Sequence, residues 1–382
     1  MTRPNKADFD RAANGLLTIF KTYGDLYKLA DHNGLLPLVY ALEPAEAWRN
    51  KYSVLVAQDA CQRQALEEIT AAAREKHIPL IPVKGFRIKD LYPASWMRPM
   101  YDLDFLYWQE DRDALFSVME ALGYAPETVD AYNHDEFYRP PFLYVELHRE
   151  LIAGVHETAR YFSDIRERSV TDETGRRDLT EEDHYLYFTA HFHKHLCEHG
   201  GTGIRSLFDL FLLNRSRSAS FDDKKVAREL KRMGLDAFSA RYSRMAEDLF
   251  GSEEPVIAPW EAELDYMLKS GTYGSVENKF EQRYGRSRNR VSYVFRRLFP
   301  TYRDMCAYYP RLAGKPLLLP FYYLRRMVEA VTIHRHELKR ELRMLSRKKE
   351  KHPTPDGGSA VTPASDAADG HGAEDRADHG DI

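Results

Sequence analysis

The stretch that decides the fold of this chain is RPMYDLDFLY, at residues 98–107. Two aspartates, Asp102 and Asp104, stand one residue apart within its apolar run. Successive side chains of a β-strand point to opposite faces, so a strand here would place both aspartates on one face and the apolar residues on the other. Two adjacent carboxylates repel and are costly to bury alone, and a divalent cation such as Mg²⁺ is their usual partner. The alternative is a surface strand that carries two hydrated acids.

The preceding segment, IPLIPVKG at 78–85, reads as a short buried strand that ends in Lys84-Gly85, before a helical stretch. A strand followed by glycine and a helix start offers free backbone N–H groups to a phosphate, and Gly85 permits close approach. Lys84 could neutralise a phosphate as a point charge, and Arg98 could grip one bidentately. Alternatively, Lys84 only ends a strand, and Arg98 pairs with one of the two aspartates.

A third segment, FLYVELHREL at 142–151, alternates in a strand pattern and follows a predicted helix at 111–124. Glu146 and His148 share one face of this strand, so Glu146 could be a third carboxylate on a strand near the aspartates. His148 could orient that carboxylate, contact a substrate or act as a base. It could equally be a neutral histidine of the core.

In order and spacing, these motifs resemble a bacterial family of uncharacterised nucleotidyltransferases within the DNA-polymerase-β-like superfamily. The residues that carry the resemblance are Lys84-Gly85, Tyr92-Pro93, Arg98-Pro99, Asp102, Asp104, Gly123-Tyr124 and Glu146-Leu147-His148. Weaker similarity continues to about residue 345. Most members of the wider superfamily carry Gly-Ser at the first helix, where the serine assists triphosphate binding, whereas Lys84-Gly85 stands there in this chain.

The resemblance implies a transferase that moves a nucleoside monophosphate from an NTP to a hydroxyl or phosphate acceptor, with Mg²⁺ or Mn²⁺. It implies catalytic and metal-binding roles for Asp102, Asp104 and Glu146, and nucleotide-binding roles for Lys84, Gly85 and Arg98. The alternative is a catalytically silent relative that acts as a nucleotide- or protein-binding module.

A histidine cluster, HFHKH at 191–195, is the other conspicuous motif. His191 and His195 are spaced to share one helix face. This spacing suits a zinc pair, but neither a metalloprotease glutamate nor a nearby cysteine pair completes such a site. In the resembling family, a helix with similar histidines packs beside the core. We therefore expect both histidines, with His148 and an Arg205–Asp209 ion pair, to line a substrate cleft, or else to be polar packing between helices.

The fold class predicted from these segments is α+β, with a small mixed-sheet core and flanking helices. We expect an N-terminal helical segment at 1–77, the nucleotidyltransferase core at 78–155, a larger helical domain at 156–350, and a disordered tail at 351–382. Thr180 with the acids that follow it predicts a helix start. The polar stretch 270–290 reads as a loop or hinge, and the basic stretch 334–351 reads as the solvated end of a helix.

The composition of the chain limits the classes of partner and the compartment that we expect. The net charge of −4 gives no general attraction to nucleic acid, so a small-molecule, sugar or polypeptide acceptor is favoured over RNA. The three cysteines lack metal-ligand spacing and imply no disulfide, which fits a reducing cytoplasm. The first residues lack the layout of a signal peptide, and no apolar run reaches the roughly 20 residues of a membrane-spanning helix.

Overall fold

A computed structural model of the chain describes residues 3–332, except 132, 154–155, 172–175, 273, 275, 286–289, 303–304, 306–308, 310–311 and 313, and also describes residue 345. Contacts between residues divide the chain into two compact units. The first comprises residues 1–152 and 157–275, and the second comprises residues 153–156 and 276–382. The expected tail and nearly all of the basic stretch lie outside the described residues, and the four-part division stays a prediction.

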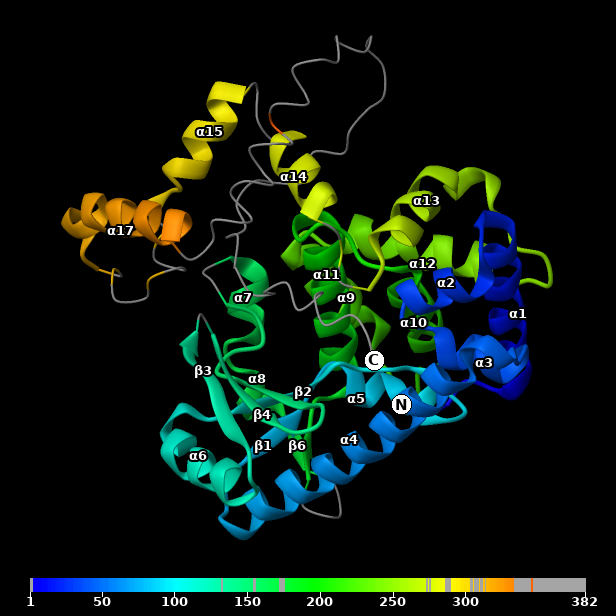
Figure 1. The fold of residues 1–382 in the computed structure, drawn as a ribbon, viewed down its shortest axis with the longest axis horizontal. Helices are drawn as coiled ribbons and strands as arrows, with labels where there is room; N and C mark the ends of the chain where they lie inside the picture. Colours follow the sequence, from blue (N-terminus) through cyan, green and yellow to red (C-terminus); the bar gives the residue numbers. More distant parts are fainter. Residues whose placement is uncertain are drawn as a thin grey trace. The chain divides into compact units, whose positions relative to one another are not determined.

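A five-stranded mixed sheet forms the centre of the first unit, with strand order β1-β2-β5-β4-β3 (Figure 1). Its strands are β1 (Leu80–Pro82), β2 (Asp102–Tyr107), β3 (Ala125–Ala131), β4 (His134–Arg139) and β5 (Leu143–His148). β2 and β5 are parallel neighbours, and the other adjacent strands pair antiparallel. The chain between β2 and β5 contains helix α6 (Arg112–Ala121) and the β3–β4 hairpin.

One face of the sheet is apolar and is covered by two helices. The apolar alternation of β2 and β5 buries Leu103, Phe105, Val145 and Leu147 completely on this face. They form one core with residues of α4 (Arg49–Glu75) and α6, which pack against each other and cover this side of the sheet (Figure 1). Burying this face fixes the strand register, because a slip by one residue would expose it.

The other face of the sheet carries the polar residues, and its apolar positions join a large helical core. Leu106 of β2 and Ile81 of β1 belong to this second core. Its helices include α1 (Lys6–Tyr23), α9 (Glu181–Glu198), α10 (Ile204–Arg215), α12 (Asp236–Phe250) and α13 (Glu261–Ser270). The predicted start of α9 is confirmed, since Thr180 accepts a hydrogen bond from the Asp183 backbone N–H at 3.1 Å. The α+β fold class is likewise confirmed.

Shorter elements complete the first unit. They include α2 (Leu26–His32), α3 (Leu36–Leu42), α5 (Gly85–Lys89), α7 (Glu157–Phe162), α8 (Ile165–Arg168), α11 (Asp223–Met233) and the two-residue strands β6 (Val170–Thr171) and β7 (Arg177–Asp178). Helix α5 begins at Gly85, one residue before the helical stretch that the sequence predicted.

The second unit contains α14 (Val276–Gly285), α15 (Arg290–Leu298) and α17 (Leu319–Thr332). Our prediction of a loop over 270–290 was therefore wrong across α14. Phe280 of this helix is buried in a small aromatic cluster with Tyr293, which gives the polar segment an apolar face to pack. Among the described residues, none of the helices combines the length and hydrophobicity that crossing a lipid bilayer would need.

Candidate active site

The parallel pairing of β2 and β5 brings the three predicted carboxylates together. Asp104 and Glu146 are direct partners in the register, and Asp102 lies opposite Tyr144, two residues before Glu146. Alternation therefore places all three acids on one face of the sheet. Oxygen atoms from Asp102, Asp104 and Glu146 lie within 4.8 Å of one another. This donor set fits a hard divalent cation, which prefers carboxylate oxygens and could be shared among them.

Lys84 reaches into this carboxylate cluster. Its Nζ lies 2.6 Å from Asp104 Oδ1 and 3.5 Å from Glu146 Oε2. Burial alone would lower the pKa of this ammonium, but attraction to Asp104 and Glu146 outweighs it and raises the pKa well above its usual value. Lys84 is thus a charged partner of the acids, a role the sequence had not predicted.

The backbone of Lys84 adopts a conformation that residues other than glycine rarely adopt. Its φ is 57° and its ψ is −116°, between the end of β1 and the first residue of α5. Such conformations cost about 1–3 kcal/mol and persist where surrounding contacts enforce them. Here the ion pair with Asp104 holds the side chain of the residue.

The carboxyl groups of Asp102 and Glu146 differ in the direction of their pKa shifts. Burial, reinforced by Asp104 and Glu146, raises the pKa of Asp102 to about 8. Burial would also raise the pKa of Glu146, but Lys84 and the hydrogen bond from His148 hold it well below its usual value. Without a metal ion, Asp102 is therefore the carboxyl of the pair that takes a proton near neutral pH.

His148 bridges two of the three acids. Its Nε2 lies 2.8 Å from Asp104 Oδ1 and 3.1 Å from Glu146 Oε2. Burial and Lys84 lower the pKa of this imidazole, yet the hydrogen bonds to Asp104 and Glu146 outweigh them and raise it. Of the alternatives for His148, the contacts favour orientation of the carboxylates over a neutral core histidine.

Arg98 contacts a carboxylate other than the ones we considered. Its Nε and Nη2 donate to the two oxygens of Asp209 on α10 at 2.8–3.0 Å, and Tyr92 donates its hydroxyl to the same group at 2.8 Å. We had expected Asp209 to pair with Arg205, whereas Arg205 donates to the Pro99 carbonyl at 3.0 Å. Side-chain spacing along one helix did not reveal the longer-range partner.

Gly85, the first residue of α5, lies close against two side chains. A Cβ atom added there would lie 2.1 Å from Met100 Sδ and 3.1 Å from Arg98 Nη1. The space beside its Cα is thus occupied by side chains of the segment before β2. Its predicted role in nucleotide binding stays a prediction.

Helix α9 presents several side chains to the carboxylate face. Burial and the charges of Asp104 and Glu146 raise the pKa of the Tyr187 phenol, although Lys84 opposes them. One turn further, burial, then His195 and Lys84, lower the pKa of His191 far below its usual value. The Nε2 atoms of His191 and His195 are 3.1 Å apart. Tyr187 was missed, although its i, i+4 spacing from His191 was a usable signal.

Strand β4 adds two further residues that we did not predict. In the register, His134 lies opposite His148, and Glu136 lies opposite Glu146. The alternation of HDEFYR at 134–139 could have shown that both lie on one strand face. This alternation was not recognised in the sequence, because the surrounding hairpin is charged and irregular. The pairing of β3 with β4 is interrupted by register shifts.

A comparison with protein families gives a match over residues 22–251 to the family described as uncharacterised nucleotidyltransferase. The chain belongs to this nucleotidyltransferase family. The resemblance inferred from the motifs is confirmed, and membership supports nucleotidyl transfer as the activity. No curated protein matches the sequence.

Two solved structures are similar to this nucleotidyltransferase. One is a solution structure of the antibiotic-resistance factor ANT(2'')-Ia, with 15% identity, a TM-score of 0.28, and coverage of 55% of this chain and 99% of that chain. The other is a crystal structure of ANT(2'')-Ia in complex with adenylyl-2''-tobramycin, with 15% identity, a TM-score of 0.26, and coverage of 50% and 97%.

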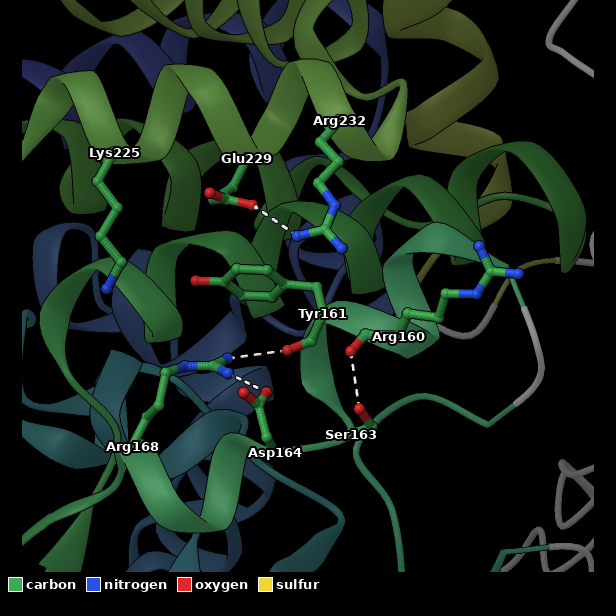
Figure 2. A pocket seen from close by; sticks show the side chains of 8 residues that line it. All are labelled: Arg160, Tyr161, Ser163, Asp164, Arg168, Lys225, Glu229 and Arg232. Carbon is green, nitrogen blue, oxygen red and sulfur yellow. Dashed lines mark hydrogen bonds and ion pairs between the residues drawn. The ribbon is translucent and has the colours of Figure 1, made fainter.

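The nucleotidyltransferase also has a cleft of about 380 Å³ that is lined by α7, α8, α11 and the residues between α7 and α8. Figure 2 shows Lys225, Glu229 and Arg232 projecting from α11 toward Tyr161 and Arg168. Its lining includes Arg160 and Asp164 but none of the carboxylates on the sheet. Arg168 and Arg232 form ion pairs with acids, so much of the positive charge is already balanced.

Proposed function

We propose that the chain transfers a nucleoside monophosphate from an NTP to an acceptor hydroxyl or phosphate, with release of pyrophosphate. Asp102, Asp104 and Glu146 would hold divalent cations, Mg²⁺ or Mn²⁺. The observation that carries the proposal is the convergence of these three carboxylates on one sheet face within 4.8 Å. Bound divalent ions would neutralise phosphate charge and lower the pKa of an acceptor hydroxyl.

The residues around the acids would hold them and the nucleotide in place. His148 fixes the orientation of Asp104 and Glu146 through its hydrogen bonds to both. When cations engage the acids, the Lys84 ammonium would be released to meet a phosphate at the start of α5. Arg98 stays a candidate for nucleotide binding, although Asp209 already engages its Nε and Nη2.

The acceptor would enter on the same sheet face, below α9. We propose His191 and His195 as acceptor-contacting residues, since the charge of Lys84 acts on the buried His191. Arg205 and Asp209 would support the wall of the predicted substrate cleft beside the carboxylates through their contacts with Pro99 and Arg98. The net charge of −4 favours a small molecule, sugar or polypeptide over RNA.

The test uses the full chain, each of the four NTPs labelled at the α-phosphate, Mg²⁺ or Mn²⁺, and a panel of acceptors that includes the protein itself. Transfer is read as label on the acceptor and as pyrophosphate. Asp104→Asn should abolish transfer, because an amide binds a divalent ion poorly. Asp113→Asn on the exposed surface of α6 is the matched control and should behave as wild type. Wild-type transfer by Asp104→Asn would refute the proposal.

A catalytically silent binding module is the second candidate. The observation that favours it is the Lys84 ammonium, which lies 2.6 Å from Asp104 and partly balances the charge of the acids. A silent module would bind NTP equally well with and without Mg²⁺. Calorimetric titration of NTP in Mg²⁺ and in a chelator therefore separates the two candidates before any acceptor is known.

A further inference from the structure

Strands β2, β5 and β4 arrange their polar side chains in register on the carboxylate face. Asp104, Glu146 and Glu136 follow one another across the three strands. Beside this row, His148 pairs with His134 across β5 and β4. Two imidazoles thus flank the row of acids, and neither of them is part of the apolar core.

The two histidines converge with Glu146. Ligand atoms of His134, Glu146 and His148 lie within 4.8 Å of one another, and the two ring centroids are 5.2 Å apart. Both histidines are more than nine-tenths buried, with exposed fractions of 9% and 6%. Two imidazoles with one carboxylate form a donor set that metal ions of borderline softness prefer, whereas Mg²⁺ prefers oxygen ligands.

The orientation of the His134 ring supports a cation beside it. Its Nδ1 lies 3.2 Å from Asn133 Oδ1, and the Asn133 amide nitrogen donates to the Glu150 carbonyl at 3.1 Å. Asn133 therefore holds the ring at Nδ1 from outside the cluster, as the hydrogen-bond partners of metal-binding histidines do. The other nitrogen, Nε2, faces the cluster and lies 3.1 Å from Glu136 Oε1.

We propose that His134, His148 and Glu146 form a second divalent-ion site, with Glu136 as an additional oxygen ligand, that selects a borderline ion such as Zn²⁺ or Co²⁺ over Mg²⁺. Glu146 is shared with the carboxylate site, so the two sites adjoin while their ligand chemistry differs. The inference concerns ion binding and does not depend on nucleotidyl transfer.

The experiment uses the full chain, freed of metal with a chelator that is then removed, and titrated with Co²⁺ in excess Mg²⁺. Mixed nitrogen and oxygen coordination with fewer than six ligands gives Co²⁺ a strong visible absorption, whereas six oxygen ligands give a weak one. We expect strong absorption that saturates at one Co²⁺ per chain and persists in Mg²⁺. Weak absorption, or displacement of Co²⁺ by Mg²⁺, would overturn the proposal with the wild-type protein alone.

Variants assign the ligands. His134→Asn should weaken Co²⁺ binding at least tenfold. If circular dichroism shows that this variant does not fold, Glu136→Gln replaces it, and the same loss of affinity is expected. His77→Asn is the matched control, because His77 is exposed and has a φ of 57°, which asparagine tolerates. Wild-type affinity in a folded His134→Asn or Glu136→Gln protein contradicts the site. Intact Co²⁺ binding in a protein that transfers no nucleotide would instead reject only the proposed function.

Discussion

The buried ion pair between Arg98 and Asp209 gives the sharpest test of how the helical layer is joined to the sheet. The exposed fractions of these residues are 8% and 1%, and three N–H···O contacts of 2.8–3.0 Å connect them. Asp209→Asn keeps the shape of the side chain but leaves the guanidinium charge without its counter-charge. Breaking a buried pair in this way costs about 3–5 kcal/mol, which lowers the melting temperature by roughly 6–20 °C in a unit of this size.

Urea unfolding and thermal melting measure this cost directly. Tyr92→Phe removes one hydroxyl that donates to the same carboxylate at 2.8 Å and should cost only about 1–3 kcal/mol. Asp223→Asn is the matched control, since its partner Arg217 lies at 2.7 Å in an exposed pair, where a change within about 1 kcal/mol is expected.

A loss below about 1 kcal/mol in Asp209→Asn, similar to that in Asp223→Asn, would refute the reasoning. The double variant Arg98→Met, Asp209→Leu should recover part of the stability, because well-packed apolar residues can replace a buried pair. NTP affinity of that folded double variant then decides the role of Arg98. Unchanged affinity means that Arg98 acts in the structure and not as a nucleotide ligand.

Three further predictions concern the carboxylate face. Lys84→Met should destabilise the metal-free protein and strengthen divalent-ion binding, because the acids lose their internal cation. Thermal melting with and without Mn²⁺ measures both effects, and an equal effect of Mn²⁺ on variant and wild type would contradict the prediction. The pKa of Asp102 is raised to about 8 in the folded chain from 3.8 when unfolded, so the contribution of this group to metal-free stability is fully present below pH 4 and is lost as pH rises through 8. The difference in urea midpoint between Asp102→Asn and the wild type should therefore change across this range, and a difference that stays constant with pH would count against it. His191→Ala should raise the KM for the acceptor more than the Kd for NTP, and the reverse order would place His191 at the nucleotide.

The sequence was most informative where side-chain alternation and backbone preference agreed. β2 and β5 combine clean alternation with buried aliphatic residues, so both their existence and the faces of Asp104 and Glu146 could be predicted. The start of α9 at Thr180 was predictable for a similar reason, because capping is a local interaction.

Features that depend on long-range contacts could not be predicted. The β3–β4 hairpin lies at one side of the sheet, where charged residues are common in strands and its alternation is weak. Asp209 lies 111 residues from its partner Arg98, so helical spacing pointed to Arg205 instead. The reach of Lys84 into the acids depends on a backbone conformation that local preference argues against.

The backbone and the side chain of Lys84 favour different amino acids at this position. Glycine would adopt the φ of 57° without strain, whereas only a long cationic side chain can reach Asp104. A library screened for thermal stability in the presence of divalent ions should therefore enrich glycine at position 84. A library screened for turnover should retain lysine, and the two populations would diverge at this codon before most others.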